Sequence, residues 1–149
     1  MRISLFLYPI CLVMLFSVHL FSQNWQLVWS DEFDGAKLDS TKWDIQLGDG
    51  SEVGLPSGWG NNERQYYRKE NIELKDGNLI ITAKKEKYEE HEYTSARIRT
   101  KNKGDWTYGK FEIRAKMPIG QGIWPAIWML PTDRVYGGST ARGEIHILE

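Results

Sequence analysis

Cysteine is almost absent from this chain, which has one such residue, Cys11, among 149. Cys11 lies in an N-terminal segment that we expect to be removed, which would leave no disulfide, no thiol nucleophile and no thiolate metal site. Histidine is scarce as well. Beyond that segment only His91 and His146 are present, and their separation does not match that of paired metal ligands. We therefore predict no metal site and exclude a zinc hydrolase.

Neither sign of charge is in excess, because 19 Lys and Arg residues stand against 20 Asp and Glu residues. The sequence therefore lacks the basic patch or stripe that nucleic-acid binding needs. We predict an uncharged partner and no nucleic acid. The seven tryptophans, all beyond residue 22, suit such a partner, because flat amphipathic rings stack on the faces of sugars. Core packing also uses tryptophan, so composition leaves both interpretations open.

The N-terminal segment has no charged residue between Arg2 and Asp31 and is mostly apolar. This pattern is typical of a secretory signal peptide, and we predict cleavage near Ser22. A membrane anchor is the alternative, because the apolar stretch approaches the roughly 20 residues that span a bilayer. Pro9 and the polar end of the segment favour cleavage. We therefore expect residues 1–22 to be a signal peptide, the protein to be secreted or periplasmic, and the mature chain to have no stable membrane insertion.

No segment shows a sustained helical period, whereas alternation of apolar and polar residues recurs along the chain. This alternation predicts half-buried strands over residues 110–117 and 94–100. It also predicts a hairpin over residues 71–83, where Asp76 and Gly77 supply a tight turn. We therefore predict one all-β domain, a sandwich or jelly roll.

Three further segments have the composition of loops and turns. Residues 48–63 are rich in glycine and are predicted to form a surface loop of the kind that carries function. The mixed charges of residues 84–93 indicate a solvated hairpin end. Residues 38–43 are predicted to form one helical turn, with Asp39 or Ser40 as its cap.

The sequence GEIHILE at residues 143–149 places Glu144 and Glu149 on either side of His146 in an apolar run. A regular strand would point the two glutamates to opposite faces. A β-bulge after His146 would return Glu149 to the face of Glu144, and bulges are frequent beside active sites. Paired carboxylates suit glycoside hydrolysis, in which one attacks the sugar and the other protonates the leaving oxygen. Two solvated glutamates on an edge strand are the alternative.

Several sequence blocks, in this order, resemble the family 16 glycoside hydrolases, and within them the bacterial laminarinase-like endo-β-1,3-glucanases. The blocks are LVWSDEFDG (27–35), LDSTKW (38–43), WGNNERQYY (59–67), DGNLIITA (76–83), YTSARIRT (93–100), YGKFEIRAKMPIGQGIWPAIWMLP (108–131) and GEIHILE (143–149). The resemblance implies a concanavalin-like β-jelly-roll sandwich with a concave cleft. Family domains are much longer than this mature chain. We therefore expect residues 23–149 to be the N-terminal part of a catalytic domain, with the jelly roll incomplete at its C-terminus.

The resemblance also implies a retaining mechanism in which Glu144 is the nucleophile and Glu149 the general acid/base. The family positions that contact substrate fall on Trp124, Trp128, Trp106, Arg97 and Asn62. Some members bind a structural calcium through the opening strand and the end of the domain, and the reaction itself requires no cofactor. The implied partner is a β-glucan polysaccharide, and we expect the protein to be a monomer.

The chain departs from the family motif at His146, where the family has an Asp that hydrogen-bonds to the nucleophile. A protonated histidine there would favour the charged forms of both glutamates and so oppose an acid that must hold its proton, whereas a neutral one could still hydrogen-bond to Glu144. Three interpretations stay open: hydrolysis of β-1,3-glucan or a related β-glucan, a non-catalytic glucan-binding module, and a non-functional fragment. We expect little catalysis by these 149 residues alone.

Overall fold

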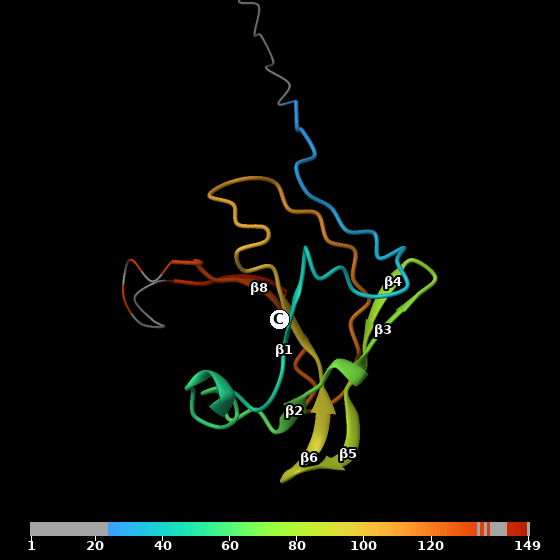
Figure 1. Cartoon of the computed structure of the whole chain (residues 1–149), viewed down its shortest axis with the longest axis vertical. Coiled ribbons are helices and arrows are strands. Elements are labelled where there is room, and N and C mark those ends of the chain that lie inside the picture. Colours follow the sequence, from blue (N-terminus) through green and yellow to red (C-terminus); the bar gives the residue numbers. More distant parts are fainter. Residues whose placement is uncertain (1–23, 134, 136, 138–142, 149) are drawn as a thin grey trace, which may run out of the picture.

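The computed structural model describes residues 24–133, 135, 137 and 143–148, and its regular elements are short strands and two turns of 3-10 helix (Figure 1). The strands are β1 (Asp44–Gln46), β2 (Gln65–Tyr67), β3 (Ile72–Lys75), β4 (Asn78–Ile81), β5 (Lys84–Tyr88), β6 (His91–Ser95), β7 (Arg97–Arg99), β8 (Ile127–Met129) and β9 (Ile145–Leu148). The helical turns are η1 (Ser51–Val53) and η2 (Lys69–Asn71). Among these described residues no helix is long and apolar enough to cross a membrane.

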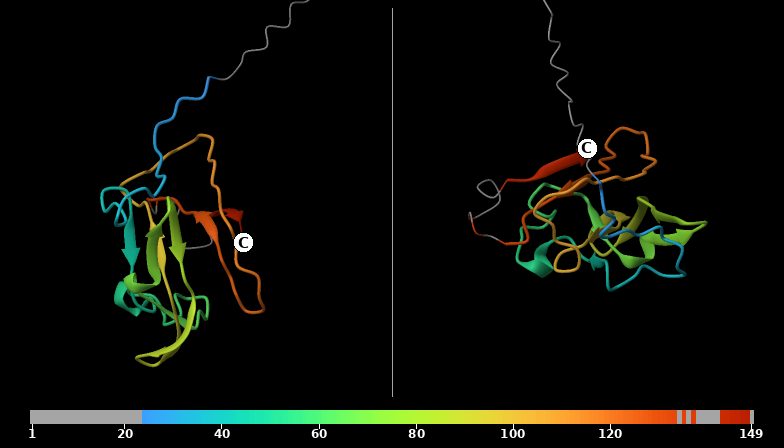
Figure 2. Two further views of the ribbon diagram at one scale, coloured as in Figure 1. Left: turned by 90° about the vertical axis from the view of Figure 1, so that its right-hand side faces the viewer. Right: turned by 90° about the horizontal axis from the view of Figure 1, so that it is seen from above.

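The described strands form four small sheets. β1 pairs with β7, β3 with β4, and β8 with β9, all antiparallel. In the remaining sheet β6 lies between β5, its antiparallel partner, and β2, which runs parallel to it. Only Ala96 separates β6 from β7, so this continuous segment links two sheets. The left view of Figure 2 shows the β8 and β9 region, orange to red, beside the green and yellow strands.

Two predicted hairpins are confirmed. β3 and β4 pair up to Lys75 and Asn78, and the two residues between them, Asp76 and Gly77, have φ of 52° and 67°. Positive φ at both central residues is what a type I′ turn requires, and its twist matches that of the flanking strands. β5 and β6 form the second hairpin, which lies at the bottom of Figure 1. The predicted surface loop at 48–63 is also present and contains η1.

The predicted helical turn at 38–43 is confirmed, with Asp39 as its cap. The backbone N–H groups of Lys42 and Trp43 both donate to the Asp39 carbonyl, at 3.0 and 2.9 Å. The backbone N–H of Thr41 donates to the Asp39 carboxylate at 2.8 Å. A side-chain oxygen that accepts from the start of the turn replaces a hydrogen bond that the backbone cannot make. This turn leads directly into β1.

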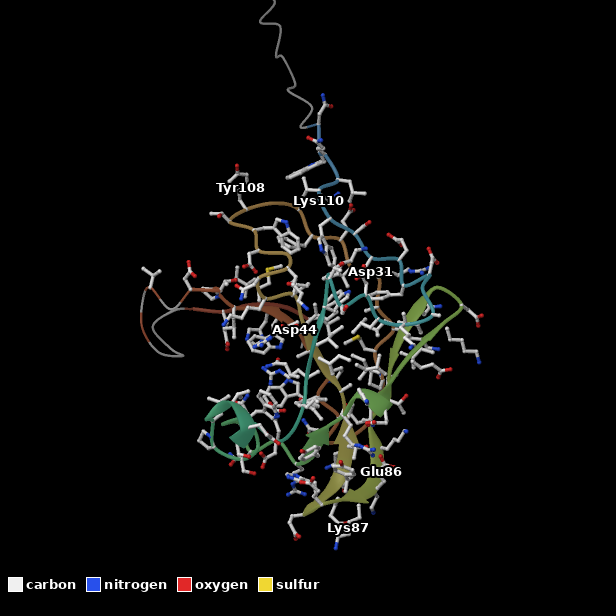
Figure 3. All side chains as sticks on the ribbon, viewed as in Figure 1. Asp31, Asp44, Glu86, Lys87, Tyr108 and Lys110 are labelled. Carbon is white, nitrogen blue, oxygen red and sulfur yellow. The ribbon has the colours of Figure 1, made fainter. Side chains whose placement is uncertain are left out.

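The predicted strand at 110–117 is wrong for the described structure. These residues pair with no other described segment and lie in the irregular stretch between β7 and β8. Alternation gives a segment two faces, but a strand also needs a neighbouring backbone to complete its hydrogen bonds. Phe111 packs edge-on against Trp106, with ring centroids 5.7 Å apart. Figure 3 shows Tyr108 and Lys110 at the opposite end of the molecule from Glu86 and Lys87 of β5.

The buried residues lie around the β6 and β7 segment and the 48–63 loop. Thr94 and Ala96 are buried in that segment, and Trp59 is buried in the loop with 5% of its surface exposed. Asn71 is buried as well, and its side-chain N–H groups donate to the Thr94 hydroxyl at 2.9 Å and to the Thr82 carbonyl at 2.8 Å. The buried Trp59 also contacts Arg97 of β7, which places the loop beside the candidate site.

Candidate functional site

The β8–β9 pair contains the predicted bulge. Its paired residues are Trp128 with His146, Met129 with Ile145, and Ile127 with Leu148. One step along β8 thus corresponds to two steps along β9, and Ile147 is the extra residue. This extra residue reverses the alternation of side chains beyond Ile147. Two glutamates five positions apart need that reversal in order to share a face. The bulge is confirmed, whereas Glu149, the predicted acid/base, lies outside the described residues.

His146 lies between Trp128 and the predicted nucleophile, Glu144. Directly paired residues of neighbouring strands point to the same face, and the Trp128 and His146 rings stack with centroids 6.3 Å apart and planes 20° apart. The Nε2 atom of His146 is 3.1 Å from Oε1 of Glu144. Because a carboxylate only accepts hydrogen bonds, Nε2 carries the proton in this contact. The histidine therefore occupies one lone pair of the candidate nucleophile.

Arg97 contacts Trp128, at the other end of the group that Glu144, His146 and Trp128 form. It projects from β7, and its Cζ atom is 4.6 Å from the ring centroid of Trp59 and 5.1 Å from that of Trp128. Its Nη1 atom is 3.6 Å from Oε1 of Glu63, and the side chains of Arg97 and Glu63 are 20% and 13% exposed. Contacts of a guanidinium with two indole faces are favourable when water is largely excluded. Arg97 therefore connects the 48–63 loop to β8.

The carboxylate of Glu63 is held by two donors from β2. The Tyr67 hydroxyl donates to Oε2 at 2.6 Å, and the side-chain N–H of Gln65 donates to the same oxygen at 2.8 Å. Burial and the neighbouring Glu63 raise the pKa of Tyr67 well above its ordinary value, so its hydroxyl keeps the proton that it donates. Glu63, Gln65 and Tyr67 stand two residues apart, the spacing that places side chains on one face of an extended chain.

Asp49 fixes the start of the loop that carries Trp59. Its carboxylate accepts from the Ser51 backbone N–H at 3.0 Å and from the Ser51 hydroxyl at 2.6 Å, and its other oxygen is 3.6 Å from Nε2 of His91. Its backbone carbonyl accepts a hydrogen bond from the backbone N–H of Trp59 at 2.8 Å. Hydrogen bonds from Ser51 and Ser57, followed by the charge of His91, hold the pKa of Asp49 well below its usual range.

Acid is therefore expected to loosen the loop around Trp59. A carboxylate with a lowered pKa contributes its full stabilisation above its ordinary pKa of about 4 and loses it as the pH falls towards its folded value. Tryptophan fluorescence of the chain should change below about pH 4, and the Asp49→Asn variant should lack this transition and be perturbed already at neutral pH. Asp76→Asn, in an exposed turn, is the matched control. Superimposable acid profiles for Asp49→Asn and the unmodified chain would contradict the assignment.

The structure brings together only some of the predicted substrate contacts. Asn62 lies exposed on the loop next to Glu63, with a φ of 60°. The run WPAIW predicts that Trp124 and Trp128 share one strand face. Trp124 is 62% exposed and precedes β8, which begins at Ile127, so this prediction is wrong. Pro125 separates them and cannot donate a ladder hydrogen bond.

Trp106 packs in a different aromatic group. Its ring centroid is 5.5 Å from that of Trp29, which in turn lies 5.4 Å from that of Trp43. The indole N–H of Trp43 donates to Asp31 at 2.8 Å, and Asp31 is labelled in Figure 3. This group joins the segment before β1 to the 105–111 region. Its ring contacts to Trp29 and Phe111 are packing contacts, and a substrate role for Trp106 stays a prediction.

Sequence reasoning missed Trp59, Glu63 and Tyr67 as members of the site. All three lie in the block WGNNERQYY, and the two-residue spacing from Glu63 to Tyr67 was a usable signal for a shared polar face. The described residues contain no group of three His, Cys, Asp or Glu side chains that could hold a metal ion.

Comparison with known proteins agrees with this architecture. The β-glucan synthesis-associated protein SKN1/KRE6/Sbg1 family matches residues 15–141. The β-glucanase of Rhodothermus marinus is 52% identical over 132 residues, which are 85% of this chain and 44% of that protein. The β-1,3-glucan-binding protein of Penaeus monodon is 57% identical over 56 residues, which are 38% of this chain and 15% of that protein.

A solved structure confirms the predicted fold class. The laminarinase catalytic domain of Thermotoga maritima superposes with a TM-score of 0.76 at 48% identity, over 83% of this chain and 50% of that one. The described strands are thus part of a β-jelly-roll, and the chain spans about half the length of the longer relatives it matches. The chain belongs to the β-glucan synthesis-associated SKN1/KRE6/Sbg1 family and, through its laminarinase relatives, to glycoside hydrolase family 16, as its sequence blocks indicated.

Proposed function

We propose that this chain forms the nucleophile side of a site that binds and hydrolyses laminarin-type β-1,3-glucan. The observation that carries the proposal is the chain of contacts from Glu144 to His146 of β9, from His146 to Trp128 of β8, and from Trp128 to Arg97 of β7. An indole face can stack on a pyranose ring, and a guanidinium can donate to its hydroxyl groups. The Glu144 carboxylate, which contacts the His146 ring stacked on Trp128, would attack the sugar that they bind.

In the proposed reaction Glu144 bonds to the anomeric carbon as the bond to the leaving oxygen breaks, and that oxygen takes a proton from Glu149. Glu149 then removes a proton from water, which releases the sugar from Glu144 with retained configuration. The bulge at Ile147 supports this assignment, because it provides the parity that two glutamates five positions apart require. The identity and coverage of the laminarinase relatives support the substrate class.

Glucan binding without hydrolysis is the second candidate, and a specific contact favours it. His146 stands at the Asp position of the family motif and holds Oε1 of Glu144 at 3.1 Å. The tryptophan and arginine contacts need no catalytic carboxylate in order to bind sugar. The similarity to a β-1,3-glucan-binding protein over 56 residues supports this alternative.

We further propose that the protein is exported as a monomer to the periplasm or the medium. The apolar segment that follows Arg2 without further charge supports recognition as a signal peptide. A β-glucan polymer is too large to enter a cell intact, so an enzyme or binding protein for it would act outside the cytoplasm. The intact mass of the protein from its host would establish whether residues 1–22 are removed.

Native gel electrophoresis of the complete chain in laminarin, together with a reducing-sugar assay, tests the proposed function. Laminarin is expected to retard the chain more than a galactan does, and Trp128→Ala should remove the retardation because it removes the stacking surface. Trp25→Ala, which changes an exposed ring near the N-terminus, is the matched control. Retardation with sugar release indicates hydrolysis, and retardation without release indicates binding alone. Equal mobility in laminarin and galactan would overturn both.

A further inference from the structure

We propose that Glu63 is a positioning residue that orients the Arg97 guanidinium, between Trp59 and Trp128, toward a hydroxyl group of the bound glucan. The inference rests on the proposed function, because it assigns to Glu63 an effect on glucan binding that is exerted through Arg97. Glu63 lies only 13% exposed behind Arg97 and is itself engaged by Tyr67 and Gln65. It therefore acts as a support for the guanidinium and leaves the sugar contact to Arg97.

Ring contacts alone do not fix the direction of the guanidinium. The Cζ atom of Arg97 lies 4.6 and 5.1 Å from the Trp59 and Trp128 centroids, and attraction between a cation and a ring face depends little on rotation within the plane. Nη1 of Arg97 lies 3.6 Å from Oε1 of Glu63, and this contact determines which edge of the guanidinium faces the carboxylate. The remaining N–H groups are directed by that contact, since the fork is rigid and planar.

Glu63 can supply a fixed direction because its own carboxylate is held. Oε2 accepts from Tyr67 at 2.6 Å and from Gln65 at 2.8 Å, while Oε1 accepts from the side-chain N–H of Asn61 at 3.4 Å and faces Nη1 of Arg97 at 3.6 Å. Tyr67 is fixed in turn by two backbone hydrogen bonds with Gly48, at 2.9 and 3.0 Å. The indole N–H of Trp59 donates to the same Gly48 carbonyl at 3.2 Å. Both residues that hold Arg97 are therefore attached to the Gly48 backbone, Glu63 through Tyr67 and Trp59 through its indole N–H.

The carboxylate also offsets the charge of Arg97. A guanidinium with no counter-ion in this position would favour an anionic sugar substituent, whereas a neutralised one suits the hydroxyl groups of a neutral glucan. Glu63 thereby influences which sugar Arg97 accepts without touching it.

The test uses Glu63→Gln in the complete chain, with the Arg97 side-chain ¹H–¹⁵N resonance and laminarin affinity as readouts. Glutamine keeps an oxygen that can accept from Tyr67 and loses the charge that holds Arg97. We expect the Arg97 resonance to move toward that of an exposed arginine and laminarin affinity to fall about tenfold. Tyr67→Phe, which frees the carboxylate without removing it, should shift both readouts in the same direction by less. Glu73→Gln, on an exposed position of β3, is the matched control and should shift neither.

Each outcome decides the inference. An unmoved Arg97 resonance in Glu63→Gln overturns it, and so does a moved resonance with unchanged laminarin affinity. If the unmodified chain does not bind laminarin, the proposed function fails, and the glucan-binding role of Glu63 fails with it, while the resonance still reports whether Glu63 orients Arg97. If Glu63→Gln does not fold, Tyr67→Phe decides: a shift of the Arg97 resonance together with weaker binding supports the inference, and wild-type values for either overturn it.

Discussion

Replacing Arg97 by alanine is expected to abolish laminarin binding and to lower the melting temperature of the chain by about 5 to 10 °C. The guanidinium contacts two tryptophan rings and is paired with Glu63, so three interactions are lost together. Glu63, whose side chain is only 13% exposed, would lose the cation that lies beside it. Leaving a largely buried charged group without its partner costs about 1 to 3 kcal/mol when some solvent still reaches it.

Binding should be lost for a separate reason. Arg97 contacts both Trp59 of the 48–63 loop and Trp128 of β8, so its removal leaves a gap between these two rings. Neither alanine nor the surrounding side chains can replace a donor aimed from that position. Laminarin affinity by calorimetry and thermal unfolding by circular dichroism measure the two effects independently.

Arg99→Ala is the matched control for Arg97→Ala. Arg99 lies two residues further along β7, is 44% exposed, and pairs with Asp44 at 3.6 Å. Exposed ion pairs of this kind contribute about 0 to 1 kcal/mol, so Arg99→Ala should alter neither laminarin binding nor melting by more than about 3 °C. Equal losses in the two variants would mean that the charge of β7, and not the contacts of Arg97, supports the site.

Features set by neighbouring residues could be predicted from the sequence. The turn at Asp76 and Gly77 depends on the φ values that these two residues tolerate, and the cap of the helical turn depends on Asp39 alone. The bulge at Ile147 followed from parity, because only an inserted residue could return Glu149 to the face of Glu144. In each case the deciding information lies within a few residues.

Features set by distant partners could not be predicted in this way. Residues 110–117 have the alternation of a strand, but alternation does not show which backbone pairs with them, and no described segment does. Trp106 matches a sugar-contacting position, yet its ring contacts in the structure are to Trp29 and Phe111. Glu63 was missed because its importance comes from Arg97, which lies 34 positions away in the sequence.

His146→Asp is expected to raise the rate of laminarin hydrolysis by at least about tenfold in the chain extended by the second half of a related laminarinase domain. In the present chain His146 donates a hydrogen bond to Oε1 of Glu144 at 3.1 Å and stacks on Trp128, which holds it in place. A donor fixed on that oxygen stabilises the carboxylate in its ground state and makes it a weaker nucleophile. An aspartate replaces the fixed imidazole donor with the family residue, which can share a single proton with Glu144 and leaves the attacking oxygen without a donor once that proton is lost.

Two variants determine whether the gain comes from the aspartate and acts through Glu144. His146→Asn removes the ring but supplies no carboxylate, and its rate should stay near that of the unmodified sequence. Adding Glu144→Gln to His146→Asp should reduce sugar release by about a thousandfold or more, since it removes the attacking group. An equal gain in His146→Asn would show that the ring obstructs the site and that the aspartate adds nothing. An unchanged rate in His146→Asp would mean that the histidine does not limit hydrolysis. The presence of His146 would then no longer favour glucan binding without hydrolysis.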